Sequence, residues 1–112
     1  MTTTIDPETF KALQDTAGAD FVVELVDAFL EEAPVMFESM RSALAEGDAD
    51  KFRRAAHSLK SNSNTFGALA LAAMAKELEL SGLQHALAKP DPLAPLREEY
   101  ERVARALKEM SR

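Results

Sequence analysis

The sequence contains no cysteine among its 112 residues. Disulfide bonds, thiolate metal sites and thiol nucleophiles are therefore excluded. Long hydrophobic runs are also missing, because the longest, 68–75, is far shorter than the ~20 residues that span a bilayer. Residues 1–10 carry neither the basic segment nor the apolar segment of a secretory signal. These absences predict a cytoplasmic protein with no membrane partner.

Positive charge is scarce as well, since 13 Lys and Arg stand against 19 Asp and Glu and give a net charge of −6. Affinity for nucleic acids depends on clustered Lys and Arg, so a nucleic-acid partner is not expected. Neither common type of glycine-rich phosphate loop is present, which argues against a nucleotide site. The composition, 46% hydrophobic and 29% charged, is that of one folded domain over 1–112.

Helical periodicity runs through almost the whole chain, and no segment has a convincing strand pattern. Asp6 is the expected N-cap of a first helix that ends at Gly18, and Pro34 is expected to kink the second. The second helix is expected over about 20–45, and the third from 48 or 50 to Gly67. The fourth is expected to start at about 68, with an end weakened by Gly82. The last is expected to start after Asp91 as N-cap and to reach about 110. The connections are short, so the long helices should be antiparallel neighbours. The sequence thus predicts an all-α fold, an antiparallel four-helix bundle with a short additional N-terminal helix.

His57 lies in the expected third helix. Each residue of a helix turns the side chain by about 100°. The apolar stripe opposite His57 consists of Phe52, Ala55, Leu59 and Ser63. The residues on its own side are Arg53, Lys60, Ser61 and Asn64, with Arg54 at the margin. Along this helix the nearest carboxylate is Asp50, two turns back. The imidazole is therefore expected to face solvent among cations and small polar groups.

A single exposed histidine on a helix is more often an ordinary surface residue than a functional one. The surroundings of His57 nevertheless suit a phosphoryl group. A neutral imidazole is a nucleophile near neutral pH, and Lys60, one turn on, can donate a charge-assisted hydrogen bond. Phosphoryl transfer requires mainly positioning and charge neutralisation. An exposed histidine beside a lysine can thus serve one half of such a reaction, if a partner supplies the metal and the acidic residue.

The segment 56–68 reads AHSLKSNSNTFGA. It resembles the signature of histidine phosphotransfer (HPt) domains, which has Ala-His-Thr-Leu-Lys-Gly, small polar residues, an apolar residue and Gly-Ala. The turn at 47–48 (GD), the segment 52–55 (FRRA) and the segment 29–34 (FLEEAP) fit the same family. Residues 71–79 are similar to its next helix, so the resemblance, to an HPt domain of the stand-alone type, covers about 20–79.

The resemblance implies that His57 is the phospho-acceptor, that Lys60 steadies the phosphoryl group, and that Gly67 ends the helix. It also implies the partners, which are receiver domains of response regulators, a hybrid histidine kinase, or both. A divalent metal is then expected on the receiver and no cofactor in this chain, which acts as a phosphocarrier and not as an enzyme. Two positions depart from the family: Ser61 stands where glycine is usual, and Thr65 where asparagine is frequent.

Two other functions compete with the phosphorelay carrier. An unphosphorylated adaptor on the same bundle would dock a receiver or another partner, but it needs neither His57 nor Lys60. A hydrolase or metalloenzyme would need a carboxylate–histidine cluster, and the second histidine, His85, has no nearby partners for a zinc site. Two further groups are assigned structural roles: Met36, Met40, Met74 and Met110 as core filler, and Glu98, Glu99, Glu101 and Arg102 as a solvated face.

The second helix has a wider apolar face than one core contact requires. One flank consists of Val23, Leu30 and Phe37, and the other of Phe21, Ala28 and Val35. Exposed apolar patches rimmed by polar residues are frequently interaction sites, so one flank is expected to dock the receiver. The handedness of the bundle decides which flank this is. The larger and more evenly spaced Val23–Leu30–Phe37 flank is favoured, and the expected docking residues are Leu30, Arg53, Ser61 and Asn64.

Overall fold

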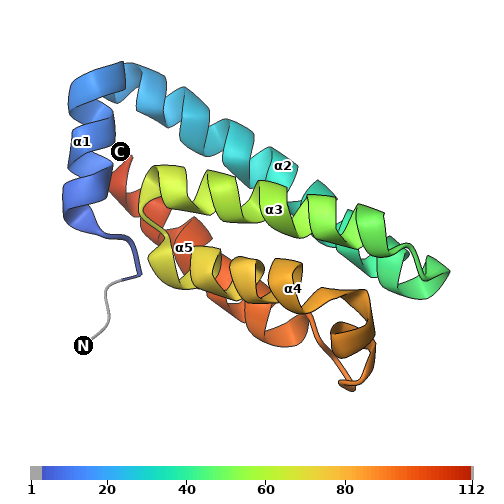
Figure 1. Cartoon of the computed structure of the whole chain (residues 1–112). Coiled ribbons are helices and arrows are strands. Elements are labelled where there is room, and N and C mark those ends of the chain that lie inside the picture. The colour runs from blue at the N-terminus through green and yellow to red at the C-terminus, as the bar shows by residue number, and fades with distance from the viewer. Residues whose placement is uncertain (1–3, 112) are drawn as a thin grey trace.

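The computed structural model of the chain describes residues 4–111. It contains five helices over this range and no strand: α1 (Pro7–Ala17), α2 (Ala19–Glu46), α3 (Ala49–Phe66), α4 (Leu69–Leu87) and α5 (Ala94–Met110). The four long helices form an antiparallel bundle, and α1 lies across the end where α2 begins (Figure 1). The predicted all-α bundle with a short N-terminal helix is confirmed. Within the described range, no helix combines the length and the apolar character needed to cross a membrane.

The starts of α1 and α3 follow from capping residues in the sequence. The Asp6 side chain accepts a hydrogen bond from the Thr9 backbone N–H at 3.2 Å, and Asp48 accepts one from the Lys51 N–H at 3.0 Å. Such caps satisfy N–H groups that have no partner within the helix. The expected cap at Asp91 is wrong, because α5 starts later, after Leu93, and has no side-chain cap. Asp91 instead accepts two hydrogen bonds of 3.3 Å from Arg97.

Gly67 connects α3 to α4 where α1 approaches most closely. Its φ of 81° is left-handed, and a Cβ at this position would meet the Thr9 Cβ at 2.9 Å and the Asp6 carbonyl at 3.0 Å. The Asp6 N–H also donates to the Gly67 carbonyl at 2.8 Å. A glycine is therefore required both by the backbone conformation and by the contact. It fixes α1 against the end of the α3–α4 pair.

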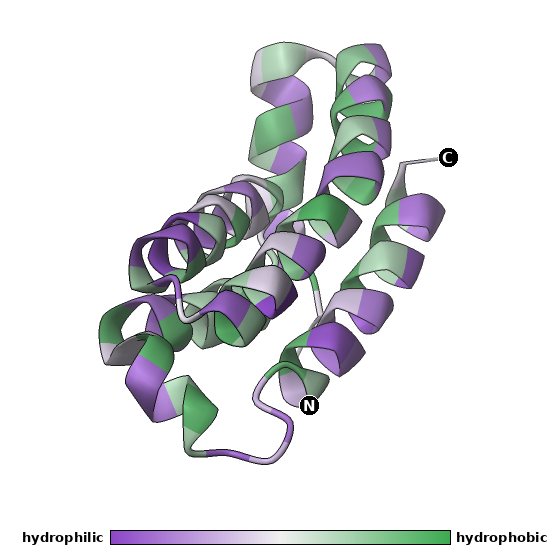
Figure 2. Ribbon diagram, turned by 90° about the vertical axis from the view of Figure 1, so that its right-hand side faces the viewer, coloured by the Kyte–Doolittle hydropathy of each residue, from purple (hydrophilic) through white to green (hydrophobic). Residues whose placement is uncertain are grey.

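Hydrophobic residues on the inner sides of all five helices share one core. Apolar and polar residues alternate along each ribbon, as expected for amphipathic helices (Figure 2). The largest fully buried side chains include Phe52, Met40, Leu59, Leu71, Leu96 and Leu107. Of the four methionines expected as core filler, Met40 is fully buried, and the other three pack against the core while partly exposed.

Glu99 in α5 and Gly82 in α4 differ from ordinary residues of an exposed helix. Glu99 is 8% exposed, so the expectation that it belongs to a solvated face is wrong; Arg102 donates to its carboxylate at 2.7 Å. Gly82 has φ 83° and ψ 176° inside α4 and interrupts the helix five residues before its end. The prediction that Gly82 weakens this end is therefore confirmed.

Candidate phosphotransfer site

His57 projects from the outer face of α3, with 54% of its side chain exposed. Phe52, Leu59 and Ser63 on the same helix are fully buried. The predicted direction of the imidazole is therefore confirmed. The buried stripe fixes the rotation of α3 about its axis, and this rotation directs His57 to the protein surface. On that surface His57 lies on the side of α3 that is nearer to α4.

The carboxylate that contacts His57 comes from α4. Glu79 Oε2 lies 2.8 Å from His57 Nδ1, and Glu79 Oε1 lies 2.9 Å from Lys60 Nζ. The prediction that only cations and small polar groups surround the imidazole is wrong, because it considered α3 alone. A signal was present in the sequence: Ala72 and Glu79 are seven residues apart and so share the face of α4 that packs on α3.

Glu79 is ionised in this arrangement. The hydrogen bond from Lys60 lowers the pKa of Glu79 below its ordinary value; partial burial opposes this effect, and the hydrogen bond from His57 adds to it. An ionised carboxylate can only accept hydrogen bonds. Nδ1 of His57 must then carry a proton, so in the neutral form of the ring the lone pair is on Nε2. The contact thus selects the tautomer whose outer nitrogen is nucleophilic.

Lys60 is less exposed than His57, at 23% of its side chain, and its ammonium reaches the site beside the imidazole. The two arginines are engaged elsewhere: Arg53 and Arg54 bind Asp50 at 2.7 and 3.0 Å. Lys60 is therefore the cation that the structure brings to the imidazole through a shared partner, Glu79.

The two small polar residues predicted near the site are both exposed. The Ser61 carbonyl accepts a hydrogen bond from the Thr65 hydroxyl at 3.1 Å. Asn64 lines a shallow hollow between α3 and α4, together with Lys60, Leu69, Ala72, Ala73 and Lys76. Ser61 and Asn64 thus lie on the outer surface around His57, as expected.

The two flanks of α2 have different environments. Phe37 packs on Tyr100 of α5 with ring centroids 5.5 Å apart, and the Tyr100 hydroxyl lies 3.5 Å from the Leu30 carbonyl. This flank therefore faces α5, and the expectation that Leu30 lies beside the histidine helix is wrong. Val35 on the other flank is 64% exposed and lines a hollow with Arg54 and Ser58 of α3. The handedness of the bundle, which the sequence left open, places the Phe21–Ala28–Val35 flank next to α3.

Within residues 4–111, no group of three or more His, Asp or Glu side chains is arranged to hold a metal ion. What the described residues do present is a helical bundle on which the ring of an exposed histidine, His57, contacts a carboxylate from the neighbouring helix.

The Hpt domain family model matches residues 24–106, and the chain belongs to this family. Proteins of the family are phosphocarriers that work with receiver domains and histidine kinases in phosphorelays.

A solved structure agrees with this assignment. The crystal structure of histidine-containing phosphotransfer protein B (HptB) from Pseudomonas aeruginosa PAO1 is similar, with a TM-score of 0.85 and 28% sequence identity. The match covers 99% of this chain and 96% of that chain. No curated protein matches the chain.

Proposed function

We propose that this chain is a phosphorelay carrier that accepts a phosphoryl group on His57 from the phospho-aspartate of one receiver domain and passes it to an aspartate of another. The observation that carries the proposal is the 2.8 Å contact between Glu79 and His57 Nδ1, on a side chain that is 54% exposed. A surface histidine without a role needs no such orientation. One with a role in transfer needs Nε2 unprotonated and accessible.

In the transfer step, the Nε2 lone pair attacks phosphorus while the bond from phosphorus to the aspartate oxygen breaks. The aspartate leaves as a carboxylate with the electron pair of that bond. The Nδ1 proton stays on the ring, and Glu79 faces the positive charge that the ring gains. The same steps in reverse deliver the phosphoryl group to the second aspartate.

Lys60 has two anionic partners in this cycle. Without phosphate its ammonium binds Glu79 at 2.9 Å. A phosphoryl group on Nε2 brings at least one more negative charge within reach of the same ammonium. Lys60 therefore neutralises the group that arrives, and we assign it the role of phosphate stabilisation.

The partner supplies the remaining components. A receiver domain, free or as part of a hybrid kinase, brings the aspartate and the divalent metal that neutralises the transferring group. In this proposal the chain uses no cofactor and no nucleotide of its own, and the reaction takes place in the cytoplasm.

We place the receiver on the Phe21–Ala28–Val35 flank of α2 and the adjacent face of α3. Phe21 is 50% exposed and Val35 64%, and apolar side chains left in solvent beside a reactive group favour docking. Arg53, Ser61 and Asn64 form the polar rim. Ser61 replaces the glycine usual in the family and adds an exposed hydroxyl that can donate to an anion.

The docking proposal has a matched pair of variants on the two flanks of α2. Val35→Asp should weaken receiver binding about tenfold or more, because a charge at a buried interface position costs about 1–3 kcal/mol. Val23→Asp changes the opposite flank at a half-exposed position and should leave affinity unchanged. Titration by isothermal calorimetry measures both, and equal affinities would rule out the Val35 flank.

The acceptor is tested by incubation with a receiver that carries labelled phosphate. We expect label that is lost in acid and survives base, which is the stability of phosphohistidine. His57→Gln should abolish the label, while His85→Gln, which changes the second of the 2 histidines, should retain it. A receiver that binds the wild-type chain without transferring label would support the adaptor function instead.

A further inference from the structure

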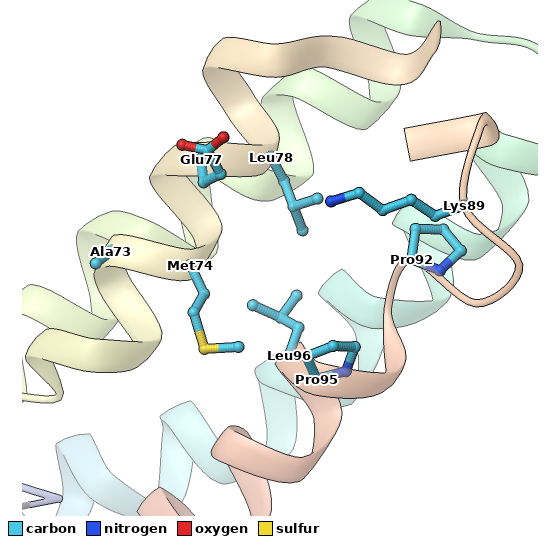
Figure 3. Close-up of a pocket in the computed structure, with 8 residues that line it drawn as sticks. All are labelled: Ala73, Met74, Glu77, Leu78, Lys89, Pro92, Pro95 and Leu96. Carbon is cyan, nitrogen blue, oxygen red and sulfur yellow. The ribbon is translucent and has the colours of Figure 1, made fainter. Parts of the chain in front are cut away.

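A second concave site lies between α4 and α5, on the side of α4 that faces away from α3. Its lining residues are Ala73, Met74, Glu77, Leu78, Lys89, Pro92, Pro95 and Leu96 (Figure 3). We call it the α4–α5 pocket. It is open to solvent and has a volume of about 310 Å³, at the lower end of the ~300–1,000 Å³ of small-molecule sites.

The walls of the α4–α5 pocket are apolar and largely preformed. The side chains of Met74 and Leu78 on α4 point toward Leu96 on α5 across the gap (Figure 3). Pro92 and Pro95 form the remaining wall, and proline fixes its own backbone angle. A ligand would therefore bind apolar surface whose shape requires little ordering.

Two charged residues line this pocket, Lys89 and Glu77, and neither is in an ion pair among the described residues. The Lys89 side chain extends across the pocket, with the ammonium directed toward Leu78 (Figure 3). The carboxylates nearby do not pair with Lys89: Asp91 binds Arg97 at 3.3 Å, and the Glu77 carboxylate points away from Lys89 (Figure 3) and accepts from the Ser81 hydroxyl at 3.1 Å. An apolar cavity crossed by a lysine side chain, with the carboxylate turned away, is complementary to a molecule with an apolar body and one negative end.

We propose that the α4–α5 pocket binds a small amphipathic anion, with a hydrocarbon body between Met74, Leu78 and Leu96 and a carboxylate at Lys89. Glu79 lies on the α3 side of α4, so the ligand and a docked receiver occupy different faces of the protein. The proposal goes beyond the phosphorelay function and does not depend on it.

Octanoate is a suitable probe, because it combines a flexible apolar chain with one carboxylate. In a titration of the full chain followed by ¹H–¹⁵N NMR, we expect millimolar octanoate to shift the amide signals of Met74, Leu78, Lys89 and Leu96. His57→Gln should bind octanoate as the wild type does. A failure of the phosphotransfer proposal can therefore be distinguished from a failure of octanoate to bind this pocket.

Charge recognition is tested by two variants of equal charge. Lys89→Gln should weaken octanoate binding by about threefold to fivefold, the range for one exposed ion pair, and should leave octan-1-ol binding unchanged. Lys108→Gln removes an exposed lysine at the far end of α5 and should change neither. Ala73→Phe, which places a ring at the pocket mouth from an exposed position, should weaken binding of both probes.

Three results would overturn the proposal. The first is an octanoate titration that shifts none of the pocket signals or shifts signals over the whole surface. The second is equal binding of octanoate to Lys89→Gln and the wild type. The third is a protein dimer that buries the pocket, detected by analytical ultracentrifugation and dissociated by Ala73→Glu, which would assign the pocket to a second copy of the chain.

Discussion

The two sides of α4 are built differently. Toward α3 it presents small residues: Ala72 and Ala75 are 4% and 0% exposed, and Ala56 on α3 is fully buried as well. Toward α5 it presents Met74 and Leu78 across an open pocket. Close approach of α3 and α4 lets the short side chain of Glu79 reach both His57 and Lys60. The side that positions the reactive group is therefore the tightly packed one, as the precise orientation of a ring requires.

Glu79 and Glu77 provide the sharpest test of this difference, because they lie two residues apart on opposite sides of α4. Glu79→Ala should slow phosphotransfer from a phospho-receiver by about 10–100-fold, the usual cost of losing an orienting partner. Glu77→Ala should leave the rate unchanged. Glu79→Gln should recover much of the rate, because its amide oxygen still accepts from Nδ1. Rapid-quench measurement of labelled transfer tests all three, and equal rates for Glu79→Ala and Glu77→Ala would contradict the account.

Lys60 and Lys76 line the same shallow hollow, and of these two lysines Lys60 alone forms an ion pair with Glu79 among the described residues. Lys60→Ala should slow transfer or shift its equilibrium by about 1–3 kcal/mol, the value of a direct charge-assisted contact. Lys76→Ala should do neither. The check is to measure forward and reverse transfer with one receiver. Unchanged rates in both directions for Lys60→Ala would exclude direct contact with phosphate.

Because the two sides of α4 are packed differently, Ala72 and Ala73 should differ in how well they tolerate a larger side chain. Ala72→Leu introduces three carbons into the α3–α4 contact and should lower the free energy of unfolding by about 1–3 kcal/mol. Ala73→Leu, at an exposed position, should change it by no more than about 0.5 kcal/mol. Urea denaturation followed by circular dichroism measures both changes. Similar losses for the two variants would show that α3 and α4 are not packed as described.

The smallest expected effect is on the pH dependence of stability. The folded protein lowers the pKa of Glu79, mainly through Lys60, so the stabilisation is complete above the ordinary carboxyl pKa and is lost as pH falls through the folded value. The excess stability of the wild type over Glu79→Gln should therefore shrink as pH falls below about 4. Glu77→Gln serves as the control, and denaturation series at several pH values supply the data. If the difference in free energy of unfolding between the wild type and Glu79→Gln stays constant with pH, the ion pair between Glu79 and Lys60 does not form in solution.

The sequence was sufficient for the features that act within one helix. The cap at Asp6, the turn at Gly67 and the outward direction of His57 all follow from local patterns, and the structure agrees with each. The sequence leaves the start of the third helix open between 48 and 50, and the structure places its cap at Asp48. A capping residue interacts only within its first turn, so its position can be predicted without knowledge of the fold.

The features that the sequence did not predict arise between helices. Glu79 is 22 residues from His57, and its contact depends on the register of α3 against α4. The exposed flank of α2 depends on bundle handedness, which amphipathic patterns do not specify. Glu99 has a charged side chain in a charged segment, and its burial depends on the helices that pack against α5, which are α2 and α4. In each case the neighbouring helix, and not the residue's own helix, determines the environment.

The most direct test of the account is to determine which nitrogen of which histidine carries the phosphoryl group. Long-range ¹H–¹⁵N NMR of the chain, ¹⁵N-labelled at histidine and phosphorylated by a receiver, distinguishes the two ring nitrogens. The account predicts phosphate on Nε2 of His57, with the proton retained on Nδ1 beside Glu79. Phosphate on Nδ1 of His57, or on His85, would contradict it.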